Sequence, residues 1–177
     1  MDGGTARVPA FGGPAVFLHR AAHLLYFDAS AAQEVFEAMH EFFSHTGDIG
    51  VRIWAGTAEG LFAAAVQAFA DTITDAAAVR AIDAAALTLR APGLDLLLHD
   101  FLGELLFDFD ARQRLVARAE VVLEQEAGGW VLTATTRGET MVEGHHAIKV
   151  LIKGITYHAL DVTEAAGQWT ATVVFDV

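Results

Sequence analysis

The sequence contains no cysteine in its 177 residues, which excludes disulfides, zinc–thiolate sites and thiol nucleophiles. Basic residues are also scarce, because 11 Lys and Arg stand against 23 Asp and Glu, for a net charge of −12. A protein that follows nucleic-acid phosphates needs clustered Lys and Arg. We therefore expect no direct, tight binding to nucleic acid, although an acidic protein can still meet a basic protein partner.

No apolar run reaches the roughly eighteen residues that a transmembrane helix needs. The nearest candidate, residues 15–27, is interrupted by His19, Arg20 and His23, and it makes a poor secretory signal because only Arg7 precedes it. Alanine contributes much of the 54% apolar content and of the mean hydropathy of +0.38. We expect a cytoplasmic protein with no membrane segment, and a chain of this length can bury the core of one domain.

The first 38 residues are predicted to form an N-terminal extension. Residues 1–13 are rich in glycine and predict a flexible start. Ser30 and Gln33 form a capping box, and the apolar residues behind it recur with the period of a helix. These apolar residues are Val35, Phe36, Met39, Phe42 and Phe43. The pattern predicts an amphipathic helix from about residue 31 to Phe42.

Further along, the apolar pattern switches between the periods of strands and helices. One helix is predicted behind the capping residue Thr57, with Glu59 in its first turn, and a second over Leu94–Leu106. The expected strands span residues 49–54, 84–91, 115–126, 130–137, 155–163 and 168–174. The last four form two hairpins. This order predicts an α+β fold of two layers, with two helices packed on antiparallel sheet.

Acidic residues at two distant points of the chain are candidate metal ligands. Asp48 stands just before a predicted strand, and Asp176 precedes Val177, whose α-carboxylate ends the sequence. Carboxylate oxygens suit a hard divalent cation such as Ca²⁺, Mg²⁺ or Mn²⁺ better than Zn²⁺. Three converging carboxylates would repel one another, so we expect a cation or Lys153 to neutralise them.

The histidines give weaker signals. We expect His45 and His158 to pack or hydrogen-bond beside the metal ligands; if either is a ligand itself, a softer transition metal becomes credible. The adjacent His145 and His146 would point to different sides of an extended chain, so they make a weak chelating pair. Acids on the outer face of the second helix predict a surface exposed to solvent.

Four motifs in order resemble those of the archease family. His45-Thr-Gly-Asp48-Ile resembles the family's His-Thr-Ala-Asp-Ile, and the helical segment Asp100–Leu106 resembles Asn-Phe-Leu-Glu-Glu-Leu-Leu. Lys153–His158 resembles Lys-Ala-Ile-Thr-Tyr-His, and Asp176-Val177 resembles the closing Asp-Ile of Pro-Asp-Ile. The sequence departs from the pattern in having Gly47 for Ala and Phe175 for Pro. The likeness defines an archease-like domain over residues 39–177, and it leaves residues 1–38 as either a genuine extension or a misassigned start.

The resemblance implies a small α+β protein that is not itself an enzyme but assists an RtcB-type RNA ligase in tRNA splicing or RNA repair. That ligase joins a 2′,3′-cyclic-phosphate or 3′-phosphate end to a 5′-hydroxyl end through a guanylylated histidine, using Mn²⁺ and GTP. Family members promote the guanylylation step and multiple turnover. The resemblance also implies Asp48, Asp176 and Val177 as ligands of a divalent metal such as calcium, and Lys153 as a functional residue.

Two alternatives remain open from the residues alone. One is a small metal-dependent phosphoester hydrolase in which Asp48 and Asp176 bind the metal and Lys153 steadies a phosphate. The lack of a dense His/Asp cluster or of a phosphate-binding loop in the sequence counts against it. The other is an interaction module whose acidic C-terminus is incidental.

Overall fold

The structure is a computed structural model that describes residues 38–45 and 47–177. Within these residues it has seven strands, two α-helices and a short 3₁₀ helix, η1 (Ala76–Ala78). The strands are β1 (Met39–His45), β2 (Asp48–Ala55), β3 (Asp83–Ala91), β4 (Arg114–Glu126), β5 (Gly129–Thr140), β6 (Gly154–Ala165) and β7 (Gln168–Asp176). The helices are α1 (Ala58–Ile73) and α2 (Leu94–Arg112). The flexible start predicted for residues 1–13 lies outside the described residues.

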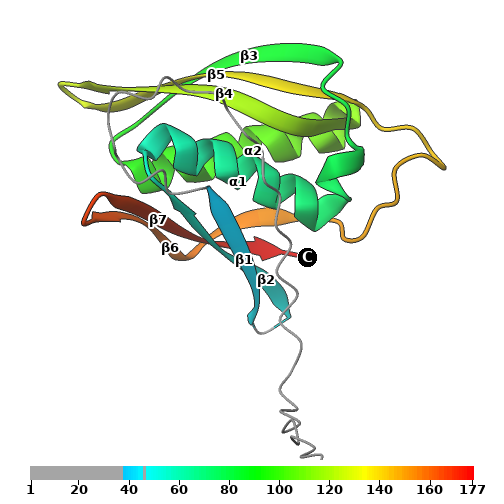
Figure 1. The fold of residues 1–177 in the computed structure, drawn as a ribbon, viewed down its shortest axis with the longest axis horizontal. Coiled ribbons are helices and arrows are strands. Elements are labelled where there is room, and N and C mark those ends of the chain that lie inside the picture. Colours follow the sequence, from blue (N-terminus) through cyan, green and yellow to red (C-terminus); the bar gives the residue numbers. More distant parts are fainter. Residues whose placement is uncertain (1–37, 46) are drawn as a thin grey trace, which may run out of the picture.

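The strands form two antiparallel sheets, and the two helices lie between them (Figure 1). One sheet has the strand order β1-β2-β7-β6 and the other has the order β3-β5-β4. Helix α1 packs on β2 of the first sheet and on β4 of the second, and apolar residues of both helices and both sheets form one core. The predicted α+β fold, with two helices packed on antiparallel sheet, is confirmed, and the second sheet adds a further layer.

Local chemistry fixes the ends of both predicted helices. The hydroxyl of Thr57 accepts a hydrogen bond of 3.0 Å from the backbone N–H of Gly60, as expected for the residue that caps α1. Helix α2 continues past the predicted end at Leu106 to Arg112, and it stops where Gln113 adopts a left-handed conformation with φ of 53°. The apolar residues predicted for its inner face are buried. Among them, Leu97, Leu98, Phe101, Leu102 and Leu105 are 0% exposed.

The helix predicted from about residue 31 to Phe42 is wrong where the structure can test it, because Met39–His45 forms strand β1. Its first part, residues 31–37, lies outside the described residues. Two of the residues assigned to a buried helical face, Met39 and Phe42, are 53% and 43% exposed. The segment instead pairs along its whole length with β2. Phe43 lies opposite Gly50, and its ring occupies the space that a side chain there would need.

The two predicted hairpins are present, and the second contains an irregularity. Next to the turn the pairing is regular: each residue of β6 from Asp161 to Ala165 lies opposite one residue of β7, and Asp161 lies opposite Thr172. The next pair is Thr156 with Val174, so residues 157–160 stand against a single residue of β7. Such a β-bulge bends a strand and redirects its side chains. This bulge belongs to the segment that the sequence marks as functional.

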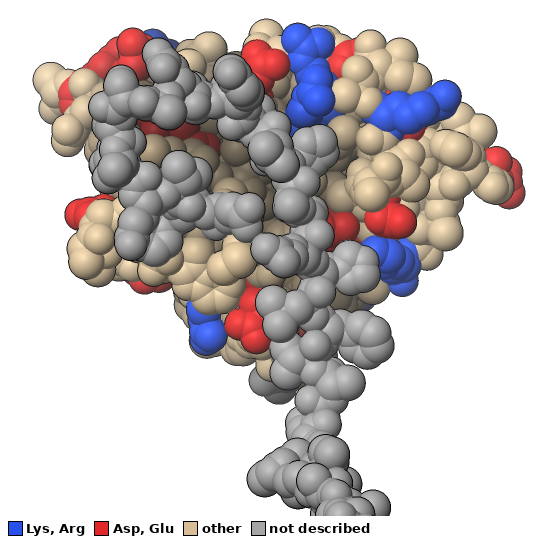
Figure 2. All heavy atoms as spheres, viewed as in Figure 1, with Lys and Arg blue, Asp and Glu red and all other residues tan. Residues whose placement is uncertain are grey.

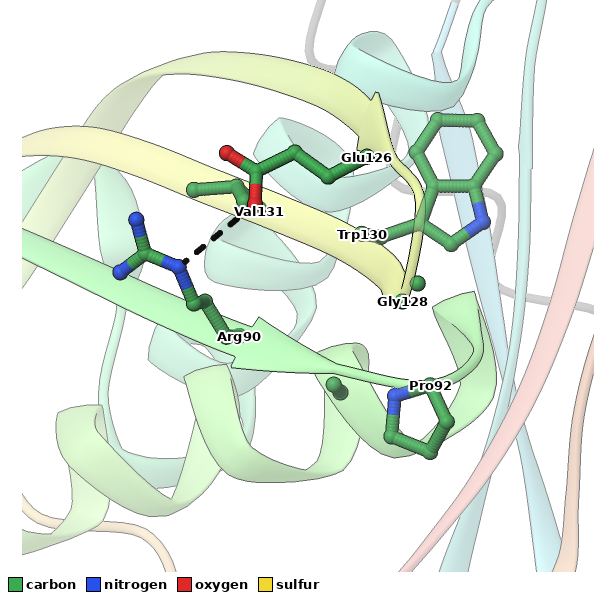
Figure 3. A pocket seen from close by; sticks show the side chains of 8 residues that line it. Arg90, Pro92, Glu126, Gly128, Trp130 and Val131 are labelled. Atoms are coloured by element: carbon green, nitrogen blue, oxygen red, sulfur yellow. Dashed lines mark ion pairs between the residues drawn. The ribbon is translucent and has the colours of Figure 1, made fainter.

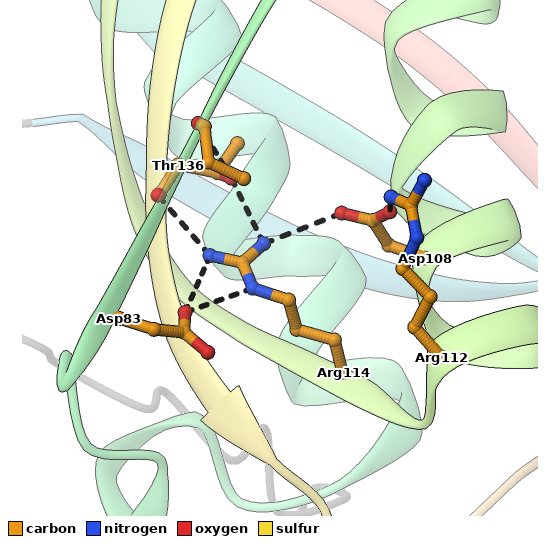
Figure 4. A network of polar contacts seen from close by, with 6 residues as sticks. Asp83, Asp108, Arg112, Arg114 and Thr136 are labelled. Carbon is orange, nitrogen blue, oxygen red and sulfur yellow. Dashed lines mark hydrogen bonds and ion pairs between the residues drawn. The ribbon is translucent and has the colours of Figure 1, made fainter.

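A buried arginine ties the end of α2 to the second sheet (Figure 4). The Arg114 side chain is only 8% exposed, and its Nε donates to Asp83 at 2.8 Å. Its Nη1 donates to the hydroxyl of Thr136 at 2.9 Å and to Asp108 at 3.3 Å. Asp108 is also paired with Arg112, one helical turn further on. Each charge in this network therefore has an opposite charge beside it, as burial requires.

No helix in the described part of the chain is long and apolar enough to span a membrane. On the face shown in Figure 2, Lys and Arg appear in separate places, with Asp and Glu around them. The described residues visible on this side therefore offer no continuous basic strip for a nucleic-acid backbone.

Candidate functional site

The ends of β1, β2 and β7 place three of the predicted residues in one row. His45, the last residue of β1, pairs with Asp48, the first residue of β2. Ile49 pairs with Phe175 of β7, so one step further along these strands Asp48 stands opposite Asp176. Directly opposed residues of an antiparallel pair point to the same face, with Cβ atoms about 5 Å apart. The fold therefore gathers His45, Asp48 and Asp176 on one face of the sheet.

This row lies on the face turned away from the helices. Phe175 is fully buried, and its ring packs edge-on against Phe69 of α1 with centroids 6.1 Å apart. Successive residues of a strand point to opposite faces, so Asp176 points outward. Its side chain is exposed, whereas Asp48 is half-buried. A partner molecule can reach the row from outside.

Lys153 and Val177 extend the row. The backbone N–H of Lys153 donates to the carbonyl oxygen of Asp176 at 2.8 Å, and its Nζ donates to the main-chain oxygen of Val177 at 2.8 Å. The ammonium group therefore lies against the oxygen that the sequence analysis assigned as a metal ligand. This contact is the one that a neutralising role for Lys153 requires.

His45 and His158 meet across the sheet. Their ring centroids are 4.8 Å apart, with 48° between the ring planes. Strands β1 and β6 are the two edges of this sheet, with β2 and β7 between them. The two imidazoles therefore meet across the strands that carry Asp48 and Asp176. His158 lies within the bulge, outside the regular pairing of β6 with β7.

The same region holds both of the buried side-chain polar atoms that have no hydrogen-bond partner within the described residues. They are Nδ1 of His45 and Oγ1 of Thr156. Thr156 pairs with Val174, which places it on the outward face together with Asp176. Buried polar groups in proteins nearly always have a partner, which can be water or an ion. Both exceptions among the described residues lie on the sheet face that carries Asp48 and Asp176.

The donor atoms fit a hard divalent cation. Asp48, Asp176 and the main chain of Val177 offer only oxygen, which Ca²⁺, Mg²⁺ and Mn²⁺ prefer. Neither His45 nor His158 joins the two aspartates in a group of three side chains whose ligand atoms all lie within 4.8 Å of one another. That His45 and His158 lie beside the ligands stays a prediction.

Comparison with known proteins identifies the family. A model of the "Archease protein family (MTH1598/TM1083)" matches residues 40–177. The chain belongs to the archease family. A protein archease of Methanopyrus kandleri is 33% identical over 133 residues, which cover 75% of this chain and 95% of the relative. A protein archease of Methanosarcina mazei is 31% identical over 139 residues, which cover 78% and 95%.

Solved structures share the archease fold. The solution structure of protein 1598 from Methanobacterium thermoautotrophicum superposes with a TM-score of 0.68 at 28% identity, covering 78% of this chain and 98% of that one. The crystal structure of a Thermotoga maritima protein, described as an archease and possible chaperone, gives a TM-score of 0.51 at 17% identity, with the same coverage. The latter supports the fold alone.

Two of the departures from the archease motifs, Gly47 and Phe175, lie next to the candidate ligands and have local explanations. Gly47 has φ of +95°, in the region that favours glycine, so an alanine in this conformation would be strained. Phe175 replaces a proline, yet its burial against α1 and the pairing of Asp176 with Gly154 hold the end of β7 in the sheet. The acidic row is therefore fixed here by packing and by the strand ladder.

One cluster of potential metal ligands was missed by the sequence analysis of this archease. Within the described residues, Glu139, His145 and His146 are the only three such side chains whose ligand atoms lie within 4.8 Å of one another. His146 does not lie on an extended chain as expected, because residues 143–146 form a turn. Nothing in the local sequence marks Glu139, since its main partner, Arg80, lies far away along the chain.

Hydrogen bonding argues against a metal at this cluster. Nδ1 of His146 accepts from the backbone N–H of Val142 at 3.1 Å, so the ring carries its proton on Nε2, which faces Glu139 at 3.2 Å. Both ring nitrogens are occupied. Glu139 in turn accepts from the backbone N–H and the guanidinium of Arg80. The cluster therefore holds the link before β6 against β5.

Acid should weaken this contact. Hydrogen bonds from the side chain and backbone of Arg80 lower the pKa of Glu139 from 4.5 to about 2, although burial opposes the shift. Because the folded pKa is depressed, the stabilisation is complete above about pH 5.5, decreases through the unfolded value, and is gone below about pH 2. The midpoint of urea unfolding should therefore fall as the pH is lowered from about 5.5 to about 3. We expect Glu139→Gln to make this dependence on pH weaker.

The control for this prediction is Glu120→Gln, which removes an exposed carboxylate that pairs with Arg137 at the surface. Its pH profile should follow the wild type, because exposed pairs contribute little. A Glu139→Gln profile that also matches the wild type would show that the Arg80 contact does not stabilise the fold.

Two hollows lie on the surface of the described residues. One, of about 280 Å³, lies beside the β4–β5 turn, where Arg90 pairs with Glu126 at 3.9 Å near the ring of Trp130 (Figure 3). It contains none of the predicted site residues. The other, of about 420 Å³, is mostly apolar and runs between Phe42 and Val150, with Asp48 on its wall. The second hollow therefore adjoins the acidic row.

Proposed function

We propose that this archease is an accessory protein of an RtcB-type RNA ligase, promoting guanylylation of the ligase and its multiple turnover in tRNA splicing or RNA repair. Family membership supports the proposal. One geometric observation carries it further. Residues of three family motifs, distant in sequence, come together at one end of one sheet, beside the outward face that carries Asp48 and Asp176. His45 pairs with Asp48 and contacts the ring of His158, and Nζ of Lys153 donates to Val177, which follows Asp176.

The same face would hold the divalent metal ion. The carboxylates of Asp48 and Asp176 and the main-chain carboxylate of Val177 would bind Ca²⁺, Mg²⁺ or Mn²⁺, since all three offer hard oxygen donors. When bound, the ion would neutralise charges that otherwise repel. Lys153 neutralises the side nearest Val177. His45 and His158 would lie beside the ligands and limit access of water from one side.

In this proposal the protein performs no reaction itself. Asp176 is exposed at the end of β7, so the acidic row is presented outward to a partner. A net charge of −12 favours a basic partner surface, such as a ligase site built to hold RNA and nucleotide phosphates. In this proposal the protein binds the ligase specifically, and it affects the RNA only through the ligase. A cytoplasmic location remains a prediction.

The proposal is tested by multiple-turnover ligation with the RtcB-type ligase of the same organism, with and without this protein. We expect faster guanylylation and repeated turnover when the protein is present. The phosphoester hydrolase is tested in parallel by turnover of phosphoesters without ligase. Hydrolysis that depends on Asp48 would favour the enzyme, and a ligase that neither binds nor responds to the protein would contradict the accessory role.

A further inference from the structure

The β6 bulge is held by side chains rather than by the sheet. Between Thr156 and Asp161 the pairing with β7 skips, so the backbone of residues 157–160 is not fixed by a regular ladder. Ala159, in its middle, has φ of +54°, a left-handed conformation that is costly for a residue with a Cβ atom. Local strain of this kind persists only where surrounding contacts enforce it.

The enforcing contact comes from α2. The ring of Tyr157 stacks on the ring of His99, with centroids 3.9 Å apart and only 12° between the planes. His99 is itself fixed, because its Nε2 lies 3.1 Å from the carbonyl oxygen of Ile155 and its Nδ1 lies 3.2 Å from Oδ1 of Asp100. Its side chain is 16% exposed, whereas Tyr157 is 65% exposed. A ring that is largely buried and contacted at both nitrogens therefore holds a more exposed one.

On the other side of the bulge, His158 contacts His45 in the acidic row. Successive residues of a strand point in opposite directions, so fixing Tyr157 against α2 also fixes the direction of His158. The two unpartnered polar atoms, on His45 and Thr156, flank this contact. The side chains of His45 and Thr156 therefore add no hydrogen bond that would hold the bulge on its outward face. On the helix side the bulge is held by the packing of Leu160 against the core and by the stack of Tyr157 on His99, and only the stack acts on the residue next to His158.

We infer that His99 and Tyr157 are positioning residues, which hold the β6 bulge so that His158 stays against His45 above the acidic row. Neither residue touches Asp48, Asp176 or Val177 in this account. If these two residues hold the bulge, they should also matter for stimulation of the ligase, and this consequence rests on the proposed function. Their effect on the contact between the His45 and His158 rings does not depend on it.

The test is an aromatic NOESY measurement on the full chain, in the wild type and four variants. We expect cross-peaks between the His45 and His158 rings in the wild type. Tyr157→Phe should retain them because it keeps the stacked ring. Tyr157→Ser and His99→Gln should lose them, since each removes one ring of the stack. Val122→Ser, at an exposed position on β4 of the other sheet, should leave them unchanged.

Thermal unfolding of each variant shows whether the fold is retained, and the exposure of Tyr157 predicts that it is. His99→Gln removes the other ring of the stack, on α2, so it still tests the inference if the Tyr157→Ser variant is unfolded. Cross-peaks that persist in either of these two variants, or that disappear in Tyr157→Phe, would overturn the inference.

Ligase stimulation gives a second and separable result. Tyr157→Ser should stimulate at least about tenfold less than Tyr157→Phe, a factor that corresponds to about 1.4 kcal/mol. Equal stimulation by the two variants would overturn the positioning role in function. If the wild type fails to stimulate any ligation, the proposed function fails, while the NOESY result still decides whether the stack holds the bulge.

Discussion

Asp176→Asn is expected to abolish most of the stimulation of an RtcB-type ligase while leaving the fold intact. The substitution keeps the shape of the side chain and the backbone pairing of β7 with β6, but it removes one of the charges that face the proposed cation. Affinity for Ca²⁺ or Mn²⁺ should decrease about 10- to 100-fold, by analogy with changes around other metal sites. Stimulation should decrease at least about tenfold, a factor equivalent to about 1.4 kcal/mol.

The matched control is Asp161→Asn, which changes an exposed aspartate on β6 of the same sheet. It makes the same change in net charge, so a general electrostatic effect on the ligase would appear in both variants. Calorimetric titration with each ion measures affinity, and multiple-turnover ligation measures function. If both variants bind and stimulate as the wild type does, Asp176 has no role as a ligand. If both lose stimulation equally, net charge rather than a specific site is responsible.

Arg114→Met should cause the largest loss of stability among the substitutions considered. Removing one member of a buried ion pair leaves its partner charged and poorly solvated, at a typical cost of about 3–5 kcal/mol. Asp108 would still be paired with Arg112, and the Asp83 side chain is 44% exposed to water. We therefore expect the free energy of unfolding to decrease by an amount near the lower end, about 3 kcal/mol. Thr136, which is fully buried, also loses the donor to its hydroxyl.

Arg118→Met is the control, because Arg118 lies on the same strand but is exposed. Its effect should lie within about 0.5 kcal/mol of the wild type. Urea unfolding of both variants measures the difference in free energy of unfolding. An Arg114→Met variant as stable as Arg118→Met would show that apolar packing alone holds α2 against the second sheet, as is known for some buried ion pairs.

Local sequence was sufficient for most elements of this fold. The apolar residues from Leu94 to Leu106 repeat with the helical period over several turns, so one burial pattern explains them. Thr57 caps α1 by a hydrogen bond within its own first turn. Glycines near 128 and 167 mark the hairpin turns. In each case the signal that predicts the element lies in residues close in sequence.

The predictions that failed, or that could not be made, concern features that depend on contacts between residues distant in sequence. Strand β1 was taken for a helix because spacing cannot show that Phe43 packs over Gly50 in pairing with β2. The pattern also does not show which strands share a sheet, so the division into two sheets was not predicted. Neighbouring residues give no sign of the bulge after Thr156, because it depends on contacts with α2 and β1.

The candidate site was predictable from motifs, but its geometry was not. The motifs pointed to Asp48, Asp176 and Lys153, and the register of β2 and β7 explains why two of these residues face each other. The contact between His45 and His158 requires the whole sheet and its bulge. The Glu139 cluster was missed because Arg80 and Glu139 lie 59 residues apart, and only the folded chain brings them together.

The proposed action of this protein on an RNA ligase is tested most directly by a time course of ligation by the RtcB-type ligase of the same organism, with RNA in excess over enzyme. With this protein present, we predict that ligated product continues to accumulate beyond the amount of ligase, and that the ligase is guanylylated again after each cycle. Identical time courses with and without the protein, despite a folded sample and the required metal and GTP, would contradict the account.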